Sequence, residues 1–342
     1  MMLHQNLPPG VVNLIRTRAV AEFATVSAAG IPIDMPTLFF QSADWRSIDV
    51  ATGLAYPAKA ERARRNPKVG LLIEGTSEQP VISIAGIATV RDADLQANLD
   101  RYLAETIFLP TVSPEVVEWS VVRKMVWYLP RIIICITPAH VRWWNKRSEM
   151  DARPQEWRAP AGAVYPKSDP APGGDPSEAP HWPQPPWQEL VGPTLAQGLP
   201  AHLTLLDQEG FPLPIRVRDI RAAREGFRMF VPKSTPWSEG TATLSFVGKE
   251  IFVGRTTRDG EDTLLRVERV LPISPLMSNR SGRQPDVYAR LAKRVDQEAA
   301  RRNQPVPGIP ELPPQPTEGA IGRAAALRSM NKSVAGGGVE RD

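Results

Sequence analysis

The chain has 342 residues, of which 42% are hydrophobic and 23% are charged. This composition is typical of a globular protein and excludes a collagenous, fibrous or wholly disordered chain. The 41 basic and 37 acidic residues leave a net charge of +4, which is too small to indicate a nucleic-acid partner. No apolar run approaches the roughly 18 residues that a membrane-spanning helix needs, so we expect no membrane partner either.

Cysteine and histidine usage limits the chemistry of the chain. Cys135 is the single cysteine, which excludes an intrachain disulfide and any cysteine-rich zinc site. The histidines His4, His140, His181 and His202 have no metal-ligand spacing, so we expect no metal. The first ten residues lack the basic segment and apolar core of a secretion signal. We therefore expect a cytoplasmic protein.

Hydrophobic periodicity predicts the elements of a first domain at 1–150. Helices are expected at 11–20, 57–67, 92–108 and 114–128, and strands at 22–27, 31–40, 47–52, 69–74, 81–90 and 131–137. Hairpins follow one another without the regular alternation of a parallel sheet, and no GxGxxG motif is present. The pattern predicts a mostly β fold, a β-barrel with peripheral helices.

Proline marks the boundaries of the remaining chain. The sequence contains 36 prolines, about 10% of its residues and roughly twice the usual share. Eleven of them lie between Pro154 and Pro193, which predicts a Pro-rich linker at 151–193. A second domain is expected at 194–280. The segment 281–342 is expected to hold an amphipathic helix at 284–302 and a disordered tail from Gln304, with a candidate helix near 319–330.

The second domain repeats the pattern of the first. An offset of 180 superposes Gly30 on Gly210 and Pro32 on Pro212, and aligns 47–52 with 227–232. The offset then drops to 173, where LLIEG at 71–75 meets LSFVG at 244–248. The seven missing residues fall on the basic helix at 57–67. Any two hairpins with a Gly-x-Pro turn look alike, but three segments in the same order favour duplication.

The segment from Ser47 to Gly75 carries the clearest candidate for a binding site. Lys59 and Arg62 are three residues apart, so they share one face of the expected helix, near its positive dipole end. The preceding strand ends in Ala51, Thr52 and Gly53, a hydroxyl residue between two small ones. Free amides, a hydroxyl and two cations favour phosphate binding. The alternative is a solvated basic face, because more arginines follow in the same run.

Residues 20–90 resemble the FMN-binding split-barrel superfamily, which contains pyridoxamine 5'-phosphate oxidase. The matching text is FATVSAAGIPIDMPTLFF, then VATG and AKAERARRNPKVGLLIEG, then VISIAGIATV. The resemblance extends over roughly 11–145. It implies that Thr52 and Lys59 contact the phosphate of FMN and that the backbone of Met35, Pro36 and Thr37 lies along the flavin ring. Arg62 is added to this site from helix geometry alone.

Departures from the oxidase pattern change the expected substrate. The oxidase has an Arg-Lys pair before the helix interior, where this chain has Ala58 and Lys59. Its second strand carries an Arg and ends in a Lys, where this chain has Met35 and Phe40. The resemblance therefore implies a flavin-dependent oxidoreductase acting on an unidentified small, weakly charged or aromatic molecule. No catalytic side chain can be assigned.

Two alternatives remain open at this point. The superfamily also includes binders of the deazaflavin F420 and of haem, so the chain is alternatively a non-catalytic flavin, F420 or haem binding protein. The flavin in this superfamily usually sits between two barrels of a homodimer. The expected assembly is therefore either such a homodimer or an intrachain pseudo-dimer, in which the second, degenerate split barrel supplies the partner surface and binds no flavin itself.

Overall fold

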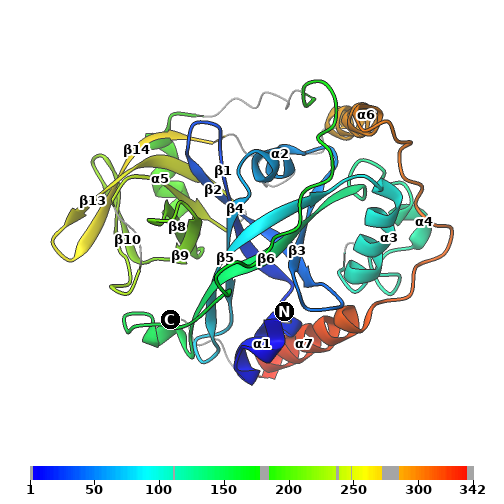
Figure 1. The fold of residues 1–342 in the computed structure, drawn as a ribbon. Coiled ribbons are helices and arrows are strands. Elements are labelled where there is room, and N and C mark those ends of the chain that lie inside the picture. The colour runs from blue at the N-terminus through cyan, green and yellow to red at the C-terminus, as the bar shows by residue number, and fades with distance from the viewer. Residues whose placement is uncertain are drawn as a thin grey trace.

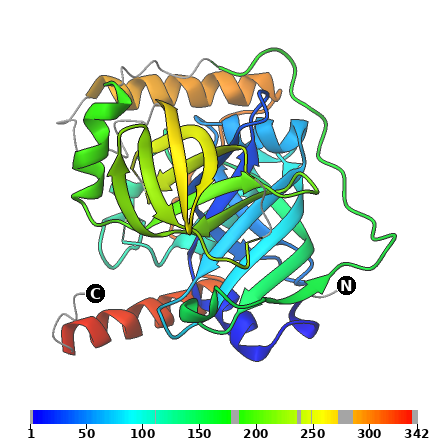
Figure 2. The same ribbon diagram turned by 90° about the vertical axis from the view of Figure 1, so that its left-hand side faces the viewer.

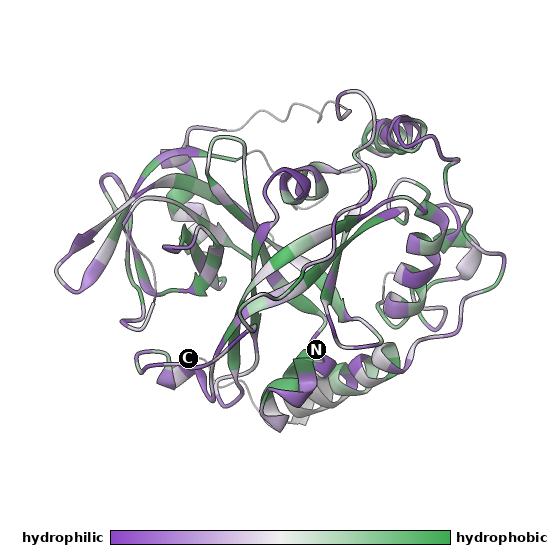
Figure 3. Ribbon diagram, in the orientation of Figure 1, coloured by the Kyte–Doolittle hydropathy of each residue, from purple (hydrophilic) through white to green (hydrophobic). Residues whose placement is uncertain are grey.

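Two antiparallel sheets of seven strands each form the centre of the molecule (Figure 1). The computed structural model describes residues 3–110, 112–177, 185–235, 239–247, 249–271 and 285–336. Among these residues, no helix is both long enough and apolar enough to cross a membrane. Hydrophobic residues gather in the strands, and hydrophilic residues cover the outer faces of the helices (Figure 3).

The first sheet closes into a six-stranded barrel. Its strands run in the order β3-β2-β1-β4-β5-β6-β7, and β3 also pairs with β6, which joins the two ends. Alternate side chains fill the interior, among them Phe23, Leu71, Ile84 and Ile134, which are 1% exposed or less. The strands are β1 (Val20–Val26), β2 (Pro32–Gln41), β3 (Ile48–Gly53), β4 (Lys68–Glu74), β5 (Val81–Arg91), β6 (Arg131–Trp144) and β7 (Gln155–Arg158).

Short helices surround this barrel close to where the sequence predicts them. The exception is 114–128, where turns replace a long helix and only α4 is helical, because β-branched valines disfavour a helix there. The indole of Trp119 anchors these turns by donating a hydrogen bond to the carbonyl of Pro310 at 2.9 Å. The helices of the first domain are η1 (Leu3–Gln5), α1 (Pro9–Thr17), α2 (Ala58–Arg65), α3 (Leu95–Thr106), α4 (Trp119–Val122) and η2 (Arg147–Glu149).

The second sheet has the strand order β10-β11-β14-β13-β12-β8-β9. Matched strand for strand, this is the order of the first barrel, with β9 and β10 together in the place of β2. Val217 alone separates β9 from β10, so one bent segment lies at both edges of a curled sheet. The elements are α5 (Trp187–Leu195), β8 (Ala201–Leu206), β9 (Pro212–Arg216), β10 (Arg218–Ala223), β11 (Gly226–Phe230), β12 (Thr241–Phe246), β13 (Ile251–Asp259) and β14 (Asp262–Val270). The chain therefore contains two split barrels in tandem.

The strand pairing agrees with the repeat residue by residue. Phe23 pairs with Leu71 in the first sheet, and Leu203 pairs with Leu244 in the second, as the offsets of 180 and 173 require. Gly30 and Gly210 both have a positive φ, of 74° and 82°, at the same place in their hairpins. Only glycine adopts this conformation without a steric cost. These matches favour duplication over two unrelated hairpins.

The two barrels pack against each other through equivalent strands (Figure 2). Strand β4 lies against β9, the counterpart of β2, and β12, the counterpart of β4, lies against β2. The carbonyl of Pro32 accepts a hydrogen bond from Thr243 at 3.0 Å, and the carbonyl of the equivalent Pro212 approaches Gly70. Because each contact occurs twice with the roles exchanged, the two barrels are related by an approximate twofold axis.

The segment expected to be a linker is partly built into the first domain. β7 extends the first sheet, and Asp169 bonds Arg91 and the backbone of Asp92. Polar side chains in this proline-rich segment account for the packing, because they form hydrogen bonds with groups at the end of β5. Residues 178–184, which include His181, lie outside the described residues. Helix α5 starts at Trp187, within the segment expected to be a linker, and packs on the second sheet.

The C-terminal segment also differs from the expectation of a disordered tail. Helix α6 (Pro285–Arg301) forms where an amphipathic helix is expected and packs on the first barrel, with Leu291 fully buried, and α7 (Glu318–Gly336) lies beside α1 and α3. Between them, Gln304 bonds the start of α3 and Thr317 bonds Glu105 at 2.9 Å. These polar contacts, together with Ile309 packed against the apolar cluster beside α3, fix a proline-rich path. Residues 337–342 lie outside the described residues.

Gly70 tests the packing of the barrels. A Cβ at Gly70 would lie 1.7 Å from the carbonyl oxygen of Pro212. We expect Gly70→Ala to destabilise the protein by about 1–3 kcal/mol or more in urea unfolding, because two backbones must separate. Gly192→Ala is the matched control, since nothing lies within 4 Å of its Cβ and alanine favours the helix. Equal effects of the two substitutions would contradict the close packing.

Candidate functional site

Helix α2 places two cations over the outer strands of the first barrel. The ammonium of Lys59 donates a hydrogen bond to the hydroxyl of Thr37 on β2 at 2.9 Å. One turn later, Arg62 Nε donates to the hydroxyl of Thr25 on β1 at 2.7 Å. The sequence predicts that Lys59 and Arg62 share a helix face, and the structure brings that face to β1 and β2.

The start of α2 contributes backbone donors beside Lys59. The helix begins after Pro57, so the amides of Ala58, Lys59 and Ala60 have no acceptor within the helix. The buried hydroxyl of Thr52 donates to the carbonyl of Tyr56 at 3.1 Å, which fixes the turn between β3 and the helix. This hydroxyl stabilises the turn by donating its proton, and its oxygen can still accept a hydrogen bond.

A third cation, Arg131, lies close to the same helix start. Its guanidinium is stacked between the rings of Tyr102 and Tyr128, at 4.3 and 4.2 Å from their centroids. It approaches Gly53, where a Cβ would lie 3.0 Å from its nitrogen. The small residue that precedes the helix therefore leaves room for a cation. The sequence reasoning missed Arg131 because it counted this residue only as the start of a strand.

Burial perturbs these cations strongly. Desolvation, with the charges of Arg62 and Arg131 beside it, lowers the pKa of Lys59 to about 7, and Glu22 opposes this only weakly. Desolvation also lowers the pKa of Arg62 to about 10, with the charge of Arg65 adding to it. Among the described residues, no carboxylate lies within ion-pair distance of Lys59, Arg62 or Arg131. These are half-buried or buried positive charges that no acid neutralises.

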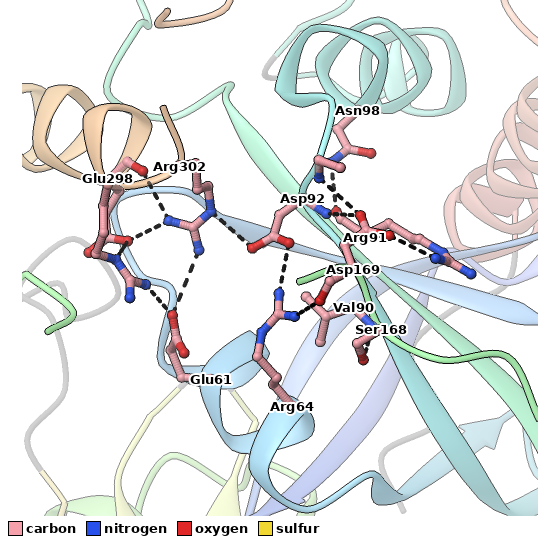
Figure 4. A network of polar contacts seen from close by, with 12 residues as sticks. Glu61, Arg64, Val90, Arg91, Asp92, Asn98, Ser168, Asp169, Glu298 and Arg302 are labelled. Carbon is pink, nitrogen blue, oxygen red and sulfur yellow. Dashed lines mark hydrogen bonds and ion pairs between the residues drawn. The ribbon is translucent and has the colours of Figure 1, made fainter. Parts of the chain in front are cut away.

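Two other charges of α2, those of Glu61 and Arg64, are neutralised, and they hold the helix in place (Figure 4). Arg64 pairs with Asp92 at the end of β5, at 2.7 Å, and Glu61 pairs with Arg301 of α6. Arg302 links Asp92 at 3.0 Å to Glu298 at 2.6 Å, and all three side chains are at most 2% exposed. Buried ions are favourable only when they are paired in this way. The unpaired cations on the opposite face of α2 are therefore an exception that needs an explanation.

The remaining candidate residues fall in two places. Met35 and Thr37 alternate with Asp34 and Pro36 along β2, and Met35 and Pro36 are partly exposed beside the Lys59 contact. Ala51 is buried instead among the apolar residues between β3 and α3. Its side chain thus belongs to the core rather than to the cation cluster.

The donor set fits a phosphate monoester. A dianion needs several charge-assisted hydrogen bonds, and Lys59, Arg62 and the free amides of α2 supply them together. The second barrel has no equivalent set in its described residues. Pro232 stands where Thr52 does and offers neither a hydroxyl nor an N–H, and no helix is found in the described part of 231–240.

The chain is similar to several solved structures at low sequence identity. No protein-family model matches the chain, and no curated protein matches it significantly. Among solved structures, it is similar to General Stress Protein 26 from Bacillus anthracis, with 17% identity, a TM-score of 0.31, and coverage of 44% of this chain and 96% of that one. It is also similar to a pyridoxamine 5'-phosphate oxidase-related, FMN-binding protein from Nostoc punctiforme, with 16% identity, a TM-score of 0.30, and coverage of 40% and 84%.

A further similar structure is the heme storage protein HutZ from Vibrio cholerae, with 16% identity, a TM-score of 0.29, and coverage of 43% of this chain and 96% of that one. Because these identities and TM-scores are low, the fold is assigned from the strand order and from the pairing of β3 with β6. The strand order and this pairing do not determine the function.

The sequence reasoning also missed a buried polar cluster between the barrels. Glu22, Asp34 and Glu74 of the first barrel lie around His202 of the second. Each of these residues is polar and lies in a strand of mostly apolar residues. This pattern is the signal in the sequence that could have indicated the cluster. The offset of 180 also places Glu22 and His202 at equivalent positions, so a twofold arrangement of the repeats would bring them together.

The network around Arg302 is open to a stability test. Arg302→Ala removes one cation from each of two buried acids, leaving Asp92 with Arg64 and Glu298 with Arg301, so we expect a loss of about 1.5–3 kcal/mol in chemical denaturation. Arg158→Ala removes an exposed pair with Glu209 and should cost at most about 1 kcal/mol. If both variants unfold at the same denaturant concentration, the network does not anchor α2.

The lowered pKa of Lys59 predicts how phosphate affinity depends on pH. In the free protein its charge is lost as the pH rises through about 7, whereas a bound dianion favours the charged form. Binding above pH 7 then takes up a proton, and affinity should fall up to about tenfold per pH unit. Below pH 6 the phosphate itself is protonated, so affinity should be greatest between about 6 and 7.

Flavin fluorescence titrations of FMN from pH 6 to 9 measure this dependence. The variant Lys59→Arg keeps its charge throughout the range, and its affinity should change little between pH 7 and 9. Glu22, Arg62 and Arg131 also face Lys59. A slope in Lys59→Arg as steep as that of the unaltered protein would assign the proton to one of these neighbours and contradict the prediction for Lys59.

Proposed function

We propose that the chain binds FMN through its first barrel and acts as a flavin-dependent oxidoreductase. The observation that carries this proposal is the pair Lys59 and Arg62, two desolvated cations with no acid partner among the described residues, beside free helix amides. A structural role would favour neutralised charges, as elsewhere on α2. An anionic ligand accounts for the difference.

Each part of the proposed site has a separate task. Lys59, Arg62 and the amides of α2 hold the phosphate, and the partly exposed backbone around Met35 and Pro36 positions the ring system. When bound, the isoalloxazine of FMN supplies the hydride or electron transfer. The chain contributes position, charge and exclusion of water. No side chain in the site is assigned as an acid or base.

The substrate that suits this site is small and weakly charged or aromatic. Met35 replaces a cation that the oxidase pattern would carry on this strand, and it is partly exposed. Phe40, the second such position, is 1% exposed and packs in the core near α3, so it adds no charge and no contact to the site. A vitamin B6 phosphate would therefore find no additional cation on β2.

We further propose that the second barrel takes the place of a second subunit. It covers β1, β2 and β4 of the first barrel through equivalent strands, which is the kind of surface a homodimer would use. It lacks the hydroxyl and basic helix at its own equivalent site. The expected stoichiometry is one FMN per chain, without a requirement for dimerisation through this face.

The absorption spectrum of the purified protein and an FMN titration test these proposals. We expect a yellow protein that is bleached by a reduced nicotinamide and reoxidised by air. Lys59→Ala should weaken FMN binding roughly ten- to a hundred-fold, because a charge-assisted phosphate contact is lost. Arg65→Ala is the matched control, since Arg65 is exposed on the same helix and carries the same charge.

Other outcomes would redirect or overturn the proposal. Bound flavin that no donor reduces would indicate a non-catalytic flavin carrier. A Soret band would indicate haem, and an absorbance of bound deazaflavin would indicate F420. A stoichiometry near two FMN per chain would contradict the role of the second barrel, and equal affinities of Lys59→Ala and Arg65→Ala would remove α2 from the site.

A further inference from the structure

The buried polar cluster on the pseudo-twofold axis belongs to neither barrel alone. Glu22 on β1 and Asp34 on β2 face His202 on β8. One ligand atom from each of the three lies within 4.8 Å of the other two. Their side chains are almost completely buried, so water does not compensate their polarity.

The imidazole of His202 is oriented from one side only. Its Nε2 lies 2.9 Å from a carboxylate oxygen of Glu74, and Arg216 lies 3.7 Å from the same oxygen. Because Nε2 is engaged with this carboxylate, Nδ1 is the ring nitrogen left for a metal ion, which binds an imidazole in its neutral form. Nδ1 lies 3.5 Å from Glu22 and has no hydrogen-bond partner. A carboxylate that fixes one ring nitrogen while the other is free is typical of metal-binding histidines.

The two carboxylates of the cluster belong to Asp34 and Glu22. Asp34 accepts a hydrogen bond from Ser245 at 2.6 Å, and Thr243 lies 3.4 Å from its other oxygen. One oxygen of Glu22 is buried without any partner in the described part of the chain. An unsatisfied buried carboxylate oxygen and an unsatisfied ring nitrogen in one cluster are costly unless another group bonds them.

We propose that Glu22, Asp34 and His202 bind a divalent first-row transition metal between the two barrels. One imidazole and two carboxylates suit Zn²⁺, Mn²⁺ or Fe²⁺ better than Mg²⁺ or Ca²⁺, which prefer oxygen ligands alone. Two ionised carboxylates balance the metal charge, and Glu74 remains paired with Arg216. Metal–ligand distances of about 2.0–2.2 Å require the three side chains to draw together slightly.

The position of this site gives it a consequence for assembly. Two ligands come from the first barrel and one from the second, so the metal joins the repeats at their axis. Its ligands form no hydrogen bond with Lys59 or Arg62 in the described part of the chain, although the charge of Glu22 acts on Lys59. Metal removal is expected to loosen the contact between the barrels.

Metal analysis of the full-length protein tests the proposal. Protein expressed in zinc-supplemented medium should carry one zinc per chain by mass spectrometry of the metals. After treatment with a chelator, Zn²⁺ at a hundredfold excess over its Kd should raise Tm by about 5 °C. Co²⁺ should give the visible absorption of a four- or five-coordinate site. An unaltered Tm with Zn²⁺ and with chelator, and no bound metal, would overturn the proposal.

Variants locate the site. Asp34→Asn and His202→Gln should abolish stoichiometric binding, and Glu74→Gln should weaken it about 10–100-fold by releasing the ring of His202. His140→Gln is the matched control, since His140 is also buried and lies 2.9 Å from Glu156 without further acids. If the ligand variants do not fold, the metal-dependent Tm of the unaltered protein still decides. Equal loss of binding in His140→Gln would refute the assignment.

Discussion

The close contact of equivalent strands across an approximate twofold axis is the constraint on which the rest of the structure depends. The carbonyl of Pro212 can approach β4 only because Gly70 has no side chain, and at the equivalent place Thr243 donates to Pro32. This contact fixes the outer faces of β1, β2 and β4. The same strands support α2 and carry the acids of the axis, so both candidate sites depend on how the two barrels meet.

The two halves of a duplicated chain are free to differ where two identical subunits cannot. Near a true twofold axis, Glu22 would face another Glu22, and two buried carboxylates would repel each other. In this chain the equivalent position holds His202, so an acid faces an imidazole. The same freedom let the second half lose the basic helix while keeping the strand order. A single chain thus combines one cation-rich helix with one covering barrel.

The charges around α2 separate structural from functional roles. Glu61 and Arg64 join a buried network with Asp92 and α6, which holds the helix against the first barrel (Figure 4). Lys59 and Arg62 meet only hydroxyl groups among the described residues. Buried ions without partners reduce stability, and a protein retains them where a ligand supplies the opposite charge. The network therefore keeps the helix rigid while its other face stays cationic.

The sequence by itself determined the six strands of the first barrel, the repeat and the helix that carries Lys59 and Arg62, because these depend on local periodicity and on glycine and proline at turns. It did not determine the packing of 155–177 and 304–317, since hydrogen bonds from side chains to distant backbone, such as those of Asp169, leave no periodic pattern. Nor did it reveal the cluster of Glu22, Asp34 and His202. Those residues lie far apart in the chain, and only the packing of one barrel on the other brings their side chains together.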